Sequence, residues 1–191
     1  MKSYLLIAFS VWALAAAAQA PDRYKNAFVC TTGKVHFFSK TPVEDIEATT
    51  TAASCVVNTD TRKVSARIPI ITFRFEKKLM EQHFNENYME TDKYPHATFD
   101  GEIINTDIDF TKDGTYDVQL KGILEIHGVK KERVLPGKIT IKNGEVHSAT
   151  TAFDVRLADH NIQIPKIVFA NIAEVIKVDG EFVFQRYRKT N

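Results

Sequence analysis

The chain has 191 residues, and its 25 basic and 24 acidic side chains leave a formal net charge of +1. Because the basic and acidic side chains nearly cancel, the protein has no general attraction toward nucleic-acid phosphates or anionic lipid surfaces. This argues against nucleic-acid partners. The length fits one domain with a sizeable apolar core, and no linker, low-complexity tract or internal repeat divides it.

The first twenty residues have the pattern of a secretory signal peptide. Lys2 precedes an apolar run over residues 5–18, and Ala18-Gln19-Ala20 provides the small residues of a cleavage site. The run is shorter than the roughly 20 apolar residues of a membrane-spanning helix, so stable membrane insertion is not expected. We therefore expect a cleaved signal peptide at residues 1–20, a mature domain at residues 21–191, and a periplasmic or secreted location.

Cys30 and Cys55 are the only cysteines, and an exported protein would fold in an oxidising compartment. An even number of cysteines in that setting favours one disulfide between them. Two free buried thiols are the alternative, because a sequence does not show whether two α-carbons come within bridging distance.

Apolar and polar residues alternate along most of the chain, which predicts strands with one apolar and one hydrated face. The phase of the alternation shifts at Pro69, where we expect a bulge. Residues 76–88 instead carry apolar side chains at helical spacing, which predicts one amphipathic helix of about three turns. Alternation resumes over residues 97–103, 116–126 and 176–184, and Asn143-Gly144 is typical of a two-residue hairpin turn.

Strands that are apolar on one side only require either a two-sheet sandwich or a closed barrel, and about eight strands are expected here. Gly101, Gly122 and Gly180 fall on the apolar face. A missing side chain there either allows tight coiling of the strands or leaves room for a ligand. Long, strongly coiled strands favour the barrel over the sandwich.

Several short motifs in a fixed order make this chain similar to the YceI-like family of lipocalin-like, polyisoprenoid-binding proteins. They are Phe73-Arg74-Phe75, Met80 to Phe84, Tyr94 to Gly101, Gly122 to Lys130 and Ile162 to Pro165, within a match over roughly residues 35–184. The resemblance implies an all-β fold: an extended antiparallel eight-stranded lipocalin-like barrel with one covering amphipathic helix. It also implies an elongated apolar interior for isoprenoid chains, and a homodimer in some members. The family pattern has no cysteines where Cys30 and Cys55 stand.

Catalytic and metal-binding motifs are missing from the sequence. It contains no nucleophile elbow, zinc-protease helix or phosphate loop, so we expect neither an enzyme nor a cofactor. The six histidines lack metal-ligand spacing and the acidic residues at 107–117 lack that of a calcium loop, so no metal is expected. His83 and Tyr94 are candidates to contact the polar head of a ligand, with a structural hydrogen bond as the alternative for His83.

The apolar face of the predicted barrel is the remaining candidate for function. Its side chains either fill a solid core or line a tunnel, and their burial stabilises the fold in both cases. With a tunnel, the protein sequesters or carries a long-chain apolar molecule, such as an isoprenoid quinone or prenyl lipid, without catalysis. A structural or interaction module with a solid core is the alternative, and an enzyme on a lipid-like substrate is a third. The residues expected to line the interior are Phe73, Phe75, Phe84, Phe99, Ile103, Val118, Leu120, Leu124, Phe153, Ile176, Phe182 and Phe184.

Overall fold

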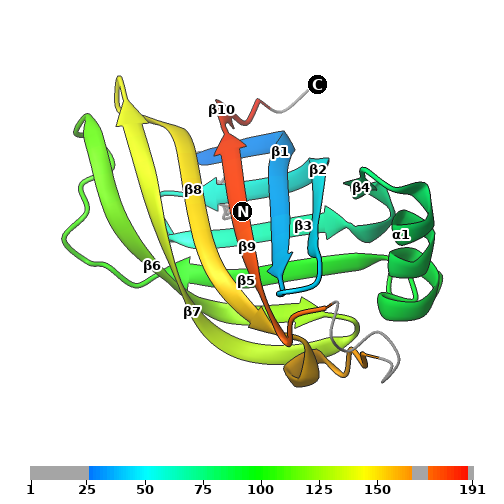
Figure 1. Cartoon of the computed structure of the whole chain (residues 1–191). Coiled ribbons are helices and arrows are strands. Elements are labelled where there is room, and N and C mark those ends of the chain that lie inside the picture. The colour runs from blue at the N-terminus through cyan, green and yellow to red at the C-terminus, as the bar shows by residue number, and fades with distance from the viewer. Residues whose placement is uncertain (1–25, 165–171, 189–191) are drawn as a thin grey trace, which may run out of the picture.

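A computed structural model describes residues 26–164 and 172–188 of the chain (Figure 1). The predicted signal peptide lies outside these residues, so its cleavage and the export of the protein stay predictions. In the described part, ten strands form one antiparallel sheet. The strands are β1 (Ala27–Lys40), β2 (Asp45–Asn58), β3 (Lys63–Pro69), β4 (Arg74–Phe75), β5 (His96–Ile103), β6 (Gly114–Ile126), β7 (Val129–Lys142), β8 (Glu145–Arg156), β9 (Val175–Val183) and β10 (Gln185–Arg186).

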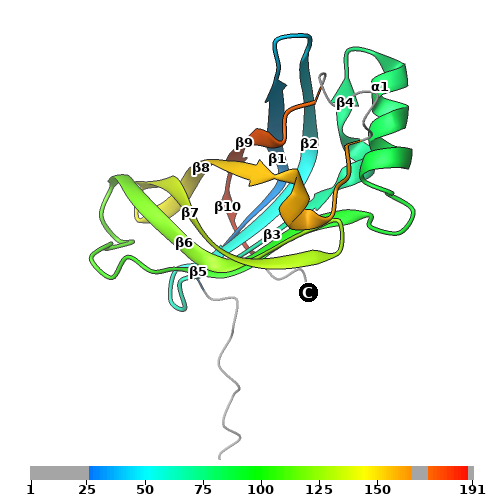
Figure 2. The ribbon, with the colours of Figure 1, turned by 60° about the horizontal axis from the view of Figure 1, so that its bottom comes forward.

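The sheet closes into a barrel because β1 pairs with both β9 and β2. The neighbours follow the order β10-β1-β9-β8-β7-β6-β5-β3-β2-β4, and the β1–β2 pairing joins its two sides. Since β4 and β10 have two residues each, the wall consists of eight longer strands (Figures 1 and 2). The predicted eight-stranded antiparallel barrel is confirmed, and the sandwich alternative is wrong.

The turns between strands agree with the sequence at one place and differ at another. Asn143 and Gly144 have positive φ values of 54° and 69° and join β7 to β8, as predicted. The bulge expected at Pro69 is wrong, because β3 ends there and a 3₁₀ turn, η1 (Ile70–Thr72), leads to β4. This turn buries Ile70 and leaves Ile71 54% exposed, which accounts for the shift of phase.

The predicted helix covers one end of the barrel. It begins as α1 (Lys78–His83) and continues as a π-helical turn, η2 (Phe84–Tyr88). Met80, Phe84 and Tyr88, four residues apart, line the barrel interior, whereas Leu79 lies 63% exposed to solvent. The helix therefore contributes one narrow apolar stripe to the interior.

Of the three inward glycines, two allow the strands to coil tightly and the third leaves space in the interior. Gly101 and Gly122 are paired across β5 and β6, and a Cβ atom added to Gly122 would lie 2.5 Å from the Cα atom of Gly101. The two backbones are too close for any side chain, so this pair permits tight coiling. A Cβ atom on Gly180 would meet only side chains, those of Phe182 and Thr151, at 3.0 Å.

The barrel is filled with side chains at the end where β10 lies. Phe28, Ile139 and Ile141 are at most 2% exposed there. Cys30 and Cys55 are directly opposite in the β1–β2 pair and are free buried thiols in this structure. The Cα atoms of opposite residues in an antiparallel pair are about 4.5–5.5 Å apart, within the range that a disulfide spans, so the disulfide stays a prediction.

Candidate ligand-binding site

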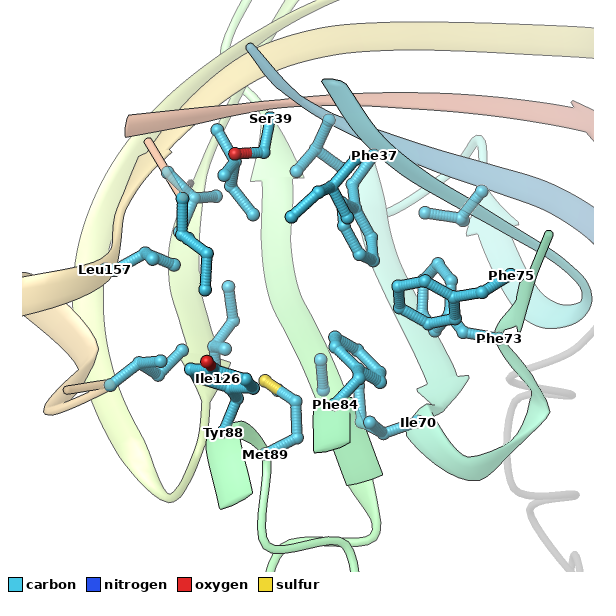
Figure 3. A pocket seen from close by; sticks show the side chains of 18 of the residues that line it. Phe37, Ser39, Ile70, Phe73, Phe75, Phe84, Tyr88, Met89, Ile126 and Leu157 are labelled. Carbon is cyan, nitrogen blue, oxygen red and sulfur yellow. The ribbon is translucent and has the colours of Figure 1, made fainter. Parts of the chain in front are cut away.

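An apolar cavity of about 270 Å³, which we call the outer chamber, lies at the end of the barrel that the helix covers (Figure 3). Its wall comes from the ends of β1, β3, β6, β8 and β9, from the helix, and from a short 3₁₀ helix, η3 (Leu157–His160). Almost all of the lining side chains are aliphatic or aromatic. The polar ones are Ser39, Glu44, His83 and Tyr88.

Four phenylalanines form one wall of the outer chamber. The ring of Phe37, on β1, lies 5.5 Å from that of Phe73, 5.7 Å from Phe75 and 5.4 Å from Phe84, measured between centroids. The rings of Phe75 and Phe84 are 5.0 Å apart. These are distances of interacting aromatic pairs. Because Phe84 belongs to the helical segment, the cluster holds that segment over the end of the barrel.

A second cavity, the inner chamber, has a volume of about 110 Å³ and lies deeper in the barrel. Its wall includes Cys55, Ile139 and Gly180. A group of side chains borders both cavities and forms the partition between them. These are Val35, Ile68, Leu124, Phe153 and Val178. The interior is therefore hollow from the helix to about the middle of the barrel and filled beyond it.

Eleven of the twelve residues predicted to line the interior border one of the chambers. Phe184 is the exception: it borders neither chamber and packs against Phe182, with ring centroids 6.4 Å apart, in the filled end. Contact of the other eleven with a ligand stays a prediction. The outer chamber has Phe73, Phe75, Phe84 and Ile176; the inner has Phe99, Ile103, Val118, Leu120 and Phe182; both have Leu124 and Phe153.

The two residues predicted to meet a head group lie in different places. His83 lines the outer chamber on its exposed side, and its ring makes no hydrogen bond with any described residue. Tyr94 borders neither chamber, so nothing in the cavity lining supports the predicted head-group contact. Its ring packs instead on His127, with centroids 4.4 Å apart, because the chain turns toward the β6–β7 hairpin there.

His127 belongs to a polar network that fastens the chamber wall from outside. Its Nδ1 atom lies 3.1 Å from the carbonyl oxygen of His160, and its Nε2 atom lies 3.1 Å from a carboxylate oxygen of Glu90. Both partners are hydrogen-bond acceptors, so the ring is held between a backbone carbonyl and a carboxylate. Hydrogen bonds from Lys93 and then His127 lower the pKa of Glu90. The network joins three segments whose neighbours line the outer chamber.

His160 lies beside this network and is held by the backbone alone. Its side chain is fully buried, and its Nδ1 atom donates to the carbonyl oxygen of Val129 at 3.2 Å. Burial lowers the pKa of this imidazole, because the protonated ring would lose its hydration. His127 and His160 therefore both serve the structure, one through a bridge between two segments and the other through a single backbone hydrogen bond.

Several lining residues were not predicted from the sequence. Phe37 and Ser39 follow Val35 at every second position, so the alternation along β1 contained the signal for both. Ile126 continues the alternation of residues 116–126, which contained the signal for it as well. Met89 follows the helical segment, where no periodic pattern marks it. Ile162 and Ile172 follow η3 in the sequence and belong to no helix or strand, so periodicity does not mark them either.

The described residues also bear on metals and membranes. Within residues 26–164 and 172–188, no three side chains of His, Cys, Asp or Glu are grouped so that they could hold a metal ion. The helices of that part are too short to cross a bilayer.

One acidic residue among those described, Glu44, borders the outer chamber. Its carboxylate forms an ion pair with Lys77, whose Nζ atom lies 2.8 Å away.

Comparison with known proteins gives a family match and a set of similar folds. The model of the YceI-like domain matches residues 26–184. A polyisoprenoid binding domain from Saccharophagus degradans, implicated in plant cell wall breakdown, superposes with a TM-score of 0.69 at 13% identity, covering 85% of this chain and 99% of that one. No curated protein sequence matches the chain.

Two further solved structures have the same fold. BcnA of Burkholderia cenocepacia has a TM-score of 0.63 at 16% identity, with 79% of this chain and 95% of that chain covered. The YCEI protein of Campylobacter jejuni has a TM-score of 0.56 at 18% identity, with 99% and 100% covered. At these identities the likeness establishes the barrel fold alone.

Proposed function

Since the chain belongs to the YceI-like domain family, we propose that it is an exported carrier that holds a long-chain apolar molecule inside the barrel without catalysis. Isoprenoid quinones and prenyl lipids are ligands of this kind. The observation that carries the proposal is a hollow of about 270 Å³ whose wall is almost wholly apolar. The similar domain from Saccharophagus degradans is described as polyisoprenoid-binding, which supports the same class of ligand.

The energy of an empty chamber supports occupancy. At about 24 cal/mol per Å³, a dry apolar cavity of about 270 Å³ costs on the order of 6 kcal/mol. That is comparable with the whole stability of a typical domain, about 5–15 kcal/mol. A ligand that fills the chamber removes this cost, so we expect the isolated protein to retain lipid or to be stabilised strongly by it.

The inner chamber favours long chains over short ones. Each buried methylene contributes about 0.8 kcal/mol, whereas association costs roughly 4–15 kcal/mol in lost freedom. A chain that ends in the outer chamber offsets little of that cost. One that passes between Leu124 and Phe153 into the inner chamber gains further contacts along the barrel.

The test begins with protein purified from its own cells without delipidation. Native mass spectrometry should detect a bound mass that solvent extraction releases as lipid. The same spectrum gives the number of subunits and so tests the predicted dimer. Protein that carries no lipid and takes up no added prenyl lipid would contradict the proposal.

A pair of variants on β5 links that bound mass to the outer chamber. Ala97 is buried and lines the chamber, whereas its neighbour Thr98 points to the other face of the strand. We expect Ala97→Phe to fill part of the chamber and lose the lipid, and Thr98→Phe to retain it. Equal lipid content in both variants would show that the ligand binds elsewhere.

A further inference from the structure

The charges around the outer chamber restrict the head group that it can enclose. Glu44 is its one acidic lining residue, and none of the described lining residues is Lys or Arg. The Glu44 carboxylate is paired with Lys77 on the rim, so that cation is already neutralised. His83, the one imidazole of the described lining, lies on the exposed side of the chamber. A carboxylate or phosphate drawn past it would lose its hydration without gaining a lysine or arginine, which is strongly unfavourable.

The chamber nevertheless offers hydrogen-bond donors. Figure 3 shows the oxygens of Ser39 and Tyr88 amid carbon atoms of the wall. The Tyr88 hydroxyl makes no hydrogen bond with any residue that the structure describes. Ser39 is 2% exposed, and its Oγ atom accepts a hydrogen bond from the Ala173 N–H at 2.9 Å, which leaves its own proton available.

The local structure explains why Tyr88 lies there. It is the last residue of the π-helical turn, four positions after Phe84, and so continues the stripe that faces the interior. Its neighbours in the wall, such as Met89, Ile126 and Leu157, have no side-chain oxygen or nitrogen. Burial raises the pKa of the Tyr88 phenol, so it keeps its proton and remains a donor. The Tyr88 side chain is only half-buried, so water can reach its hydroxyl while the chamber is empty. A tail that fills the chamber expels this water, and a ligand oxygen then gives the hydroxyl the acceptor that it would otherwise lack.

We propose that the Tyr88 hydroxyl donates a hydrogen bond to an uncharged oxygen in the ligand's head group, so that the barrel selects neutral lipids with a carbonyl over fatty acids and prenyl phosphates. Quinones, ketones and esters have such an oxygen. The inference rests on the proposed function, because it concerns the same chamber, and it adds the chemical class of the head group and the residue that recognises it.

Three ligands with the same farnesyl tail test this inference: one with a benzoquinone head, one ending in a methyl group and one with a phosphate. Their dissociation constants are measured by displacement of a fluorescent lipid from the wild type, Tyr88→Phe and Tyr116→Phe. Tyr116 is the matched control, because its hydroxyl donates to the Lys112 carbonyl at 3.0 Å and it borders neither chamber.

We expect the wild type and Tyr116→Phe to bind the quinone roughly 3- to 10-fold more tightly than the hydrocarbon, the effect of one neutral hydrogen bond. In Tyr88→Phe this difference should vanish while the hydrocarbon affinity stays the same, which shows that the chamber is intact. The phosphate should bind the wild type no more tightly than the hydrocarbon.

Three results would overturn the inference: a phosphate that binds as tightly as the quinone, a quinone preference that persists in Tyr88→Phe, or equal loss of quinone and hydrocarbon affinity in that variant. If the hydrocarbon binds the wild type without any preference for the quinone, this inference fails and the carrier function stands. If none of the three ligands binds, both fail.

Discussion

Filling the inner chamber at Gly180 tests whether one ligand chain occupies both chambers. Gly180 lies on β9 and borders the inner chamber. A Cβ atom built there would lie 3.0 Å from side-chain atoms of Thr151 and Phe182, and these can move by a few tenths of an ångström. Valine suits a strand, and its methyl groups would enter the chamber. We therefore expect Gly180→Val to fold and to shorten the space for a ligand.

The expected loss of affinity follows from the volume removed. At roughly 30 Å³ for a group the size of a water molecule, about 110 Å³ of inner chamber holds three or four methylene-sized groups. Each contributes about 0.8 kcal/mol on burial, so a chain excluded from the inner chamber loses about 3 kcal/mol. This corresponds to a dissociation constant that is roughly 100-fold larger. A chain short enough to end at the partition should bind both proteins alike.

The assay is a series of isoprenoid quinones of increasing tail length, titrated into wild type and variant. Wild-type affinity should rise with length until both chambers are full, whereas that of Gly180→Val should level off earlier. Ala152→Val is the control, because Ala152 lies on the adjacent strand with its side chain exposed outside the barrel. Identical length profiles in wild type and Gly180→Val would refute the reasoning, provided that urea unfolding shows both to be folded.

Three other predictions concern the wall of the barrel. Gly122→Ala should lower the free energy of unfolding in urea by about 1–3 kcal/mol, because its Cβ atom would lie 2.5 Å from the Gly101 Cα atom; an unchanged midpoint would contradict this close approach. Burial lowers the folded-state pKa of His160, so the unfolded chain takes up the proton first and stability falls as pH drops below about 6.5; His160→Gln should weaken this dependence between pH 8 and 5. Burial, and then the nearby Cys30, raise the pKa of Cys55 to about 12, so a thiol reagent should label neither cysteine in native protein and both in urea.

The alternation of residues was enough to predict the wall of the barrel. The runs at 97–103, 116–126 and 176–184 became β5, β6 and β9, and Asn143-Gly144 became the tight turn expected of it. The sequence predicted a bulge at Pro69 where the structure has a 3₁₀ turn, because both features shift the phase of an alternating pattern. Only the hydrogen bond from the Phe73 N–H to the Ile70 carbonyl distinguishes the two, and a sequence does not contain it.

The head-group contacts were harder to predict than the lining. Tyr94 was predicted to meet a head group because it lies near the helix in the sequence, but its ring packs on His127, outside the chambers. The helical spacing of residues 76–88 indicates that the Tyr88 ring faces inward, but it does not mark the hydroxyl as a donor to a ligand. Its importance arises from surroundings without an acceptor, and those come from β6, η3 and the segment after the helix.

Whether a barrel is hollow at a given depth is a property of all its strands together. Alternation says that Phe153 and Phe184 both point inward, and they do, yet one borders a chamber and the other lies in the filled core. Phe184 shares that core with Phe28, Ile141 and Val146, which strand register brings to the same end. Phe153 borders the inner chamber together with Gly180, which contributes no side chain there. The register of eight strands, and not the apolar character of any one of them, therefore determines where a ligand can bind.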